Sequence, residues 1–153
     1  MLKIGDKFLF EESLLDRQTC LMFLKENNSS SWSVDIGFKN GNFGDDILSP
    51  AICINPITTD KNSIGDLVGE KFRVATIEEC DDREDTFYIY ESEPMVSYDL
   101  EVLEIRDNRA HLICKGILIV DGYSEPYIQE SFEIDSWVPV IESVNDWEKV
   151  ENI

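Results

Sequence analysis

Basic residues are scarce in this sequence. Lys and Arg number 13 against 32 Asp and Glu, which gives a net charge of −19 at pH 7. A surface that binds nucleic-acid phosphates needs the opposite sign, so the composition excludes a general affinity for nucleic acid. The deficit is uneven: residues 1–76 carry 8 basic and 11 acidic side chains, and residues 77–153 carry 5 and 21. The second half therefore has a net charge of 5 − 21 = −16, which favours interaction with a positively charged partner.

Histidine, paired cysteines and long apolar runs are also rare. The one histidine is His111, and no CxxC pair occurs among Cys20, Cys53, Cys80 and Cys114, so a zinc site is not expected. We interpret the four cysteines as buried thiols. The sequence lacks a stretch of eighteen apolar residues and a signal-peptide core at its start. We therefore expect a cytoplasmic protein that does not enter a membrane.

Common catalytic and nucleotide-binding motifs are missing as well. The sequence contains no GxSxG, no GxGxxG and no GxxxxGK[ST] pattern, which argues against a serine hydrolase and a phosphate-binding loop. None of the cysteines has a neighbouring basic cluster that would lower its pKa, and a lone His111 at the start of a strand is more often structural than catalytic. We expect no enzyme and no cofactor. A pair of carboxylates in a cleft stays open as an alternative, because any two acids can meet in space.

The main pattern that is present is period-two alternation of apolar residues. It is clearest in Tyr98–Trp137, which we interpret as three consecutive antiparallel strands with turns at Asp107-Asn108 and Asp121-Gly122. The second strand has Leu112, Cys114, Leu118 and Val120 on one face and Ile113, Ile117 and Ile119 on the other. The third strand has Ile128, Phe132 and Ile134 on one side.

Shorter strands are expected before this meander. They are Ile4–Phe10, Thr19–Lys25, Trp32–Lys39, Ala51–Ile57 ended by Pro56, Glu70–Ile77 and Phe87–Tyr90. We predict a loop over Asn40–Pro50, a helical turn near Asp66–Val68, and a short helix capped by Ser143 that presents Val144, Trp147 and Val150 on one face. The pattern predicts a single domain over residues 1–153, mostly β. The expected architecture is an antiparallel β-sandwich or partly open barrel with one or two short helices.

The strongest local signal is an acidic run of eight residues that we interpret as a hairpin loop. It contains one arginine and six carboxylates, namely Glu78, Glu79, Asp81, Asp82, Glu84 and Asp85. One interpretation is a solvated loop that keeps the protein soluble. The other is a docking surface for a basic protein, because clustered like charges cost stability unless something offsets them. The spacing of an EF-hand calcium loop is absent, so no metal site is expected.

Aromatic residues form a second candidate surface. The group comprises Tyr88, Tyr90, Tyr98, Tyr123, Tyr127 and Trp137. These side chains either belong to the core of a two-layer fold or form an exposed patch. In the second case the patch is ringed by Asp99, Glu101, Glu125, Glu133 and Asp135. Aromatic rings surrounded by carboxylates favour a protein partner with exposed Lys and Arg.

The acidic meander and the stretch GYSEPYIQESFEIDSWVPVI, Gly122–Ile141, carry a family resemblance. A small, strongly acidic β domain of this kind resembles the immunity proteins of bacterial toxin–immunity systems, including contact-dependent inhibition and related polymorphic toxins. The resemblance extends over roughly the second half of the chain. It implies a basic, nuclease-like toxin as partner, whose active or substrate-binding surface is blocked by complementary charge. We expect a protein that is monomeric when free and inhibits by binding. The alternative from another class is a β-barrel or sandwich that holds a small ligand between its aromatic side chains.

Overall fold

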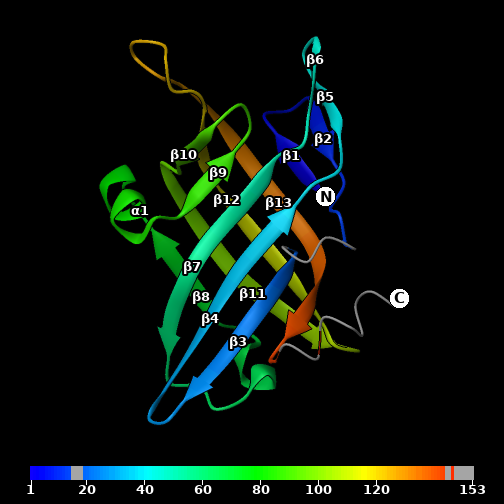
Figure 1. Ribbon diagram of the computed structural model, residues 1–153, viewed down its shortest axis with the longest axis vertical. Coiled ribbons are helices and arrows are strands. Elements are labelled where there is room, and N and C mark those ends of the chain that lie inside the picture. Colours follow the sequence, from blue (N-terminus) through cyan, green and yellow to red (C-terminus); the bar gives the residue numbers. More distant parts are fainter. Residues whose placement is uncertain (15–18, 144–145, 147–153) are drawn as a thin grey trace.

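The protein is built around one large curled β-sheet. The computed structural model describes residues 1–14, 19–143 and 146. Its elements are β1 (Leu2–Ile4), β2 (Phe8–Phe10), β3 (Cys20–Glu26), β4 (Ser29–Gly37), β5 (Gly41–Phe43), β6 (Asp46–Leu48), β7 (Ala51–Thr59), η1 (Ile64–Leu67), β8 (Lys71–Val74), α1 (Ile77–Arg83), β9 (Thr86–Tyr88), β10 (Ser92–Pro94), β11 (Ser97–Arg106), β12 (Arg109–Asp121) and β13 (Ile128–Ile141). Neighbouring strands follow the order β10-β9-β7-β4-β3-β13-β12-β11-β8 (Figure 1). The predicted mostly β, partly open barrel is confirmed.

Two antiparallel layers make up the sheet. One layer contains β10, β9, β7, β4 and β3, and the other contains β13, β12, β11 and β8, behind the first in Figure 1. They join where β13 pairs in parallel with β3, at Val140 opposite Leu21 and Ile141 opposite Met22. These two strands come from opposite ends of the chain, so the parallel pair needs no local crossover helix. The open side of the half-barrel lies between the edge strands β8 and β10, and α1 follows β8 in the chain and leads into β9.

The core fills the space between the layers with inward-facing side chains of alternating strand residues. β4 buries Trp32, Val34 and Ile36, and β12 buries Leu112 and Cys114 from the opposite side. The alternation predicted for the central meander is therefore confirmed at these positions. The four cysteines are free; three are buried and Cys53 is half-buried.

The two predicted turns of the meander have different outcomes. Asp107 and Asn108 have φ values of 53° and 61° and close a tight turn between β11 and β12, as predicted. The tight turn predicted at Asp121-Gly122 is wrong, because β12 and β13 are connected by a longer loop that contains the cis peptide bond Glu125–Pro126. A Cβ atom at Gly122 would overlap the carboxylate of Glu93, the flexible end of a side chain that would have to move aside.

The third strand of the meander and the bulge before it also differ from expectation. Phe132 and Ile134 are buried as predicted, but Ile128 at the start of β13 is exposed. The register of β12 against β13 shifts between Ile119 and Asp121, so Val120 is an extra residue in the ladder. Ile119 and Val120 are consequently both buried, although strict alternation would place them on opposite faces.

Tight turns at glycine explain why two further predictions, one of a strand and one of a loop, differ from the structure. The predicted strand Ile4–Phe10 is two strands, β1 and β2, because Gly5 turns the chain with a φ of 58°. The predicted loop Asn40–Pro50 contains the β5–β6 hairpin, whose turn includes Gly44 with a φ of 63°. Positive φ at these positions carries little steric cost for glycine.

Pro56 does not end its strand. β7 continues to Thr59, and its register against β4 shifts between Ile54 and Ile57. Pro56 thus lies in a bulge, where the ladder does not need the N–H group that proline lacks. Pro94 is the last residue of another strand, β10. The helical turn predicted near Asp66–Val68 is present as η1.

The short helix predicted after Ser143 falls mostly outside the described residues, including Val144, Trp147 and Val150. Asp146 is described, and its carboxylate accepts hydrogen bonds from the backbone nitrogens of Glu142 and Ser143 at 2.8 and 3.0 Å. None of the described helices is long and apolar enough to cross a membrane.

Candidate partner-binding surface

The acidic run forms a helix, α1, and the predicted hairpin loop is wrong. Thr76 caps its N-terminus, where the side-chain oxygen accepts a hydrogen bond from the backbone nitrogen of Glu79 at 3.2 Å. Glu78 and Glu79 lie in the first turn and Arg83 in the last, an arrangement that the helix dipole favours. The segment Thr76-Ile-Glu-Glu matches the capping-box pattern, which is the sequence signal that predicts a helix start here.

Every exposed residue of α1 and its C-cap is a carboxylate. These residues are Glu78, Glu79, Asp81, Asp82 and Glu84, and we refer to them as the α1 acidic surface. In the described part of the chain, none of the five makes an ion pair with a basic side chain. Cys80 is buried on the opposite side of the helix. The helix therefore directs uncompensated negative charge at the solvent from a fixed position.

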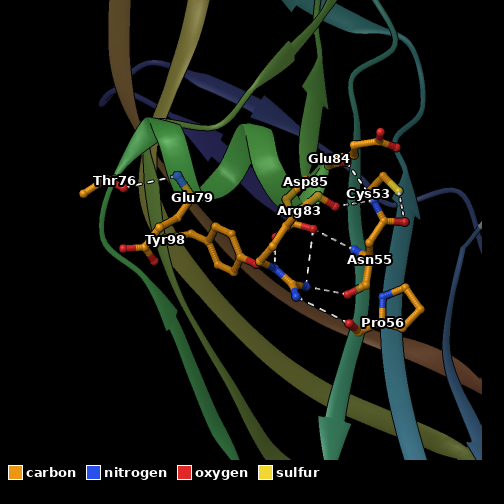
Figure 2. A network of polar contacts seen from close by, with 9 residues as sticks. All are labelled: Cys53, Asn55, Pro56, Thr76, Glu79, Arg83, Glu84, Asp85 and Tyr98. Atoms are coloured by element: carbon orange, nitrogen blue, oxygen red, sulfur yellow. Dashed lines mark hydrogen bonds and ion pairs between the residues drawn. The ribbon is translucent and has the colours of Figure 1, made fainter.

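Asp85 is separate from this surface, because its side chain is 0% exposed. Figure 2 shows its carboxylate at the centre of a polar network. It accepts hydrogen bonds from the Tyr98 hydroxyl at 2.5 Å, from Nε of Arg83 at 2.7 Å and from the backbone nitrogen of Asn55 at 2.8 Å. The prediction that Asp85 contacts a partner is wrong, because its side chain is buried. Tyr98 is buried too, so of the two interpretations of the aromatic group the core applies to this residue. A fully buried carboxylate needs such partners because an unpaired buried charge is costly.

Arg83 turns inward to satisfy that carboxylate. Its Nη2 also donates to the carbonyl of Asn55 at 2.6 Å, and its guanidinium lies 4.7 Å from the ring centroid of Phe72. Burial lowers the pKa of Arg83, but the hydrogen bond to Asp85, the negative charge of Asp85 and the contact with Tyr98 together outweigh burial and raise it. Burial and the hydrogen bond to Asp85 both raise the pKa of Tyr98. The one basic residue of the acidic run is thus used inside the protein, not on its surface.

Asn55 completes the network from the other layer. Its side-chain nitrogen donates to the carbonyls of Arg83 and Glu84 at 3.1 and 2.7 Å, which satisfies two backbone acceptors at the C-terminus of α1 (Figure 2). The network connects β7, α1 and β11, so it fixes the helix across the open side of the half-barrel.

Tyr88 and Tyr90 point to solvent as predicted. Each is 46% exposed, whereas their chain neighbours Phe87 and Ile89 are buried. The hydroxyl of Tyr90 donates to the carboxylate of Asp46 at 2.5 Å. Both tyrosines belong to the segment that follows α1 and therefore lie close to the α1 acidic surface along the chain.

The four meander carboxylates that were predicted to bind a partner lie elsewhere, on the outer face of β11 and β13, and each contacts a basic side chain. The contacts are Asp99 with Arg73 at 3.6 Å, Glu101 with Lys71 at 3.7 Å, Glu133 with Lys115 at 3.7 Å and Asp135 with His111 at 2.6 Å. Exposed pairs of this kind contribute little stability, about 0–1 kcal/mol each. They do offset the local negative charge, which sets this face apart from the α1 acidic surface.

Trp137 belongs to the same outer face. It is half-buried and stacks on His111, with ring centroids 4.9 Å apart and planes at 15°, while the guanidinium of Arg106 lies 5.1 Å from its centroid. The ring already packs against its own neighbours. The predicted site residues therefore divide between two surfaces, α1 with the tyrosines that follow it, and the outer face of the meander.

A pocket of about 430 Å³ was missed by sequence reasoning. It lies where the β9–β10 turn meets the loop between β12 and β13, and we call it the mouth pocket. It is lined by Ile89, Tyr90, Glu91, Glu93, Ile119, Val120, Asp121, Gly122 and Tyr123. Tyr90 and Tyr123 belong to the predicted aromatic group, but no local pattern indicates that these two segments meet.

Asp35 is a carboxyl group whose pKa is raised by burial, as expected for one member of a catalytic acid pair. Its direct cross-strand neighbours are Cys20 and Cys53 rather than a second acid. Burial raises the pKa of both thiols to about 12, so they are protonated at neutral pH. In the described ranges, no group of three or more His, Cys, Asp and Glu side chains is arranged to hold a metal ion.

Comparison of the chain with protein-family models, curated proteins and solved structures finds no match.

Proposed function

We propose that the protein binds a basic protein through the α1 acidic surface and thereby acts as an immunity protein, blocking the substrate-binding surface of a nuclease-like toxin. The observation that supports this proposal is the difference between the two acidic regions. The carboxylates of α1 have no basic counterpart among the described residues, whereas Asp99, Glu101 and Glu133 of the meander each pair with a lysine or arginine. The only arginine of the acidic run is held inside by Asp85.

The expected partner follows from electrostatics. An enzyme that binds a phosphate backbone presents an electropositive cleft, and a fixed row of carboxylates complements it. Such complementarity raises the association rate by about one to three orders of magnitude at low salt. Tyr88 and Tyr90, exposed in the segment that follows the helix, supply rigid aromatic contact area of the kind found at binding hot spots.

The test compares three baits in affinity capture from the source lysate, with the products of adjacent genes co-expressed. They are the wild-type chain, an α1 variant (Glu78→Gln, Glu79→Gln, Asp81→Asn, Asp82→Asn), and a meander variant (Asp99→Asn, Glu101→Gln, Glu133→Gln, Asp135→Asn). Each variant neutralises four carboxylates, so the two have the same net charge. Far-UV circular dichroism checks that all three baits are folded.

We expect a basic protein that the wild-type chain and the meander variant retain at low salt and that the α1 variant loses. Purified, that protein should cleave nucleic acid, and the wild-type chain should inhibit the cleavage. Loss of capture in the meander variant alone would assign binding to the other face and refute the role of α1. Capture that neither variant changes, with no dependence on salt, would refute the electrostatic mechanism.

A further inference from the structure

The mouth pocket combines an apolar floor with aromatic walls. Ile89, Ile119 and Val120 are buried beneath it, whereas Tyr90 and Tyr123 are 46% and 81% exposed at its sides. Its volume of about 430 Å³ is within the range of roughly 300–1,000 Å³ typical of ligand pockets. Large aromatic side chains left exposed around a concave site often mark a binding site.

Hydrogen bonds hold both tyrosines in place. The Tyr90 hydroxyl donates to Asp46, and the Tyr123 hydroxyl donates to the carboxylate of Glu91. Asp121 fixes the loop from the other side, since its carboxylate accepts hydrogen bonds from the backbone nitrogen of Tyr123 and the hydroxyl of Ser124, each at 2.9 Å. Because both hydroxyl groups already have acceptors, the tyrosines contribute their rings to the pocket rather than free donors.

The charges around the pocket are all negative. Glu91, Glu93 and Asp121 line it, and no lining residue is basic. None of the three makes an ion pair with a basic side chain in the part of the chain that the structure describes. The Glu93 carboxylate packs against the backbone at Gly122, where a Cβ atom would overlap it. The pocket therefore attracts cations and repels anions.

We infer that the mouth pocket binds an organic cation, an alkylammonium or guanidinium group, between the rings of Tyr90 and Tyr123 with carboxylates at its rim. Aromatic rings attract such cations through their negative faces, and the apolar floor accommodates the alkyl part of the ligand. A bare divalent metal ion fits poorly, since hard cations require several converging oxygen ligands and an apolar floor supplies none. Such a cationic group can belong to a Lys or Arg side chain of a protein or to a free amine.

The inference does not depend on the α1 acidic surface. The pocket is formed by the β9–β10 turn and the loop after β12, and it includes none of the five α1 carboxylates. A protein that used both sites would insert a cationic side chain here while its basic surface lies on α1.

The experiment is a titration of the ¹⁵N-labelled full chain followed by amide chemical shifts at constant ionic strength. The probes are N-acetyl-arginine amide and its neutral isostere N-acetyl-citrulline amide, and choline and its neutral isostere 3,3-dimethylbutan-1-ol. We expect saturable shifts of pocket residues with a dissociation constant on the order of 1 mM for the cations, the weak affinity that ligands this small can reach in an open pocket. Tighter binding of arginine amide than of choline would assign the site to a protein side chain, and the reverse order to a free amine.

Two variants and one control test the named residues. Tyr123→Ala should weaken cation binding by about two- to fivefold, the usual contribution of an exposed cation–π contact. Gly122→Ala should also weaken it, because the added methyl displaces Glu93 without changing the charge. Tyr88→Ala removes an equally accessible tyrosine that does not line the pocket and should leave binding unchanged.

Several results would overturn the inference. They are equal binding of each cation and its neutral isostere, shifts that do not saturate, and equal loss of affinity in Tyr88→Ala and Tyr123→Ala. The α1 variant described above keeps the pocket intact and should bind the probes as the wild-type chain does. A failed capture with intact probe binding would thus refute only the proposed function, and the opposite result only the pocket.

Discussion

Replacing Arg83 with methionine tests whether the buried network fixes α1. The substitution removes the Nε donor that lies 2.7 Å from the Asp85 carboxylate but keeps an unbranched side chain of comparable length. Asp85 is 0% exposed, so it would retain only the Tyr98 hydroxyl and one backbone nitrogen as partners. Removing one member of a buried ion pair costs about 3–5 kcal/mol, because the remaining charge is left without compensation. That is a large share of a total stability of roughly 5–15 kcal/mol.

The other members of the network are expected to cost different amounts. Tyr98→Phe removes one hydrogen bond to a charged group, about 1.5–3 kcal/mol. The double variant Arg83→Met with Asp85→Leu removes both charges and should be clearly more stable than Arg83→Met alone. Urea denaturation followed by circular dichroism at pH 7 gives the free energy of unfolding for each chain.

The matched control is Arg106→Met. Arg106 is 65% exposed and lies 3.5 Å from Glu104, so its loss should change the free energy of unfolding by less than about 1 kcal/mol. If Arg83→Met cost no more than this control, or if the double variant were no more stable than Arg83→Met, Asp85 would not depend on Arg83 and the reasoning would be refuted.

Three further predictions concern stability. Burial raises the pKa of Cys20 to about 12 and that of Cys80 to about 11, from an ordinary value near 9. The unfolded chain therefore loses these protons first. The contribution of the two thiols to stability is constant below about pH 9 and falls above it, by about 1.4 kcal/mol per pH unit for each thiol up to its folded pKa. Urea denaturation at pH 8 and pH 10.5 checks this, and equal free energies of unfolding would contradict it. Glu84 has a left-handed backbone with a φ of 59°, so Glu84→Gly should stabilise the protein by up to about 1 kcal/mol, and a lower melting temperature would count against strain at this position. Gly116→Ala should destabilise the protein by about 1–3 kcal/mol or more, because the new Cβ would overlap a backbone carbonyl of β11. Gly65→Ala should have little effect, since no atom lies within 4 Å of its Cβ position. Equal melting temperatures for the two variants would contradict this prediction.

Local patterns predicted much of the sheet because strand pairing leaves a period-two record in the sequence. The three strands of Tyr98–Trp137 and the turn at Asp107-Asn108 depend on alternation and on residues that tolerate positive φ, and both features are readable from neighbouring residues. The outward orientation of Tyr88 and Tyr90 follows from the same rule. The charge of the acidic run predicts a loop, whereas the cap at Thr76 predicts the start of a helix, and the fold follows the cap.

The candidate site could be predicted only in part. The sequence alone determined that the negative charge concentrates in the second half and that an acidic run lies between two strands, since composition and order do not depend on the fold. It did not distinguish Asp85 from Asp81, because the burial of Asp85 depends on Tyr98 and Asn55, which are distant in sequence. Tertiary structure also decided which carboxylates are paired across strands and brought the β9–β10 turn to the loop after β12 to form the mouth pocket. Alternation and charge are properties of the chain itself, whereas burial, ion pairing and cavities arise from contacts between segments that only folding brings together.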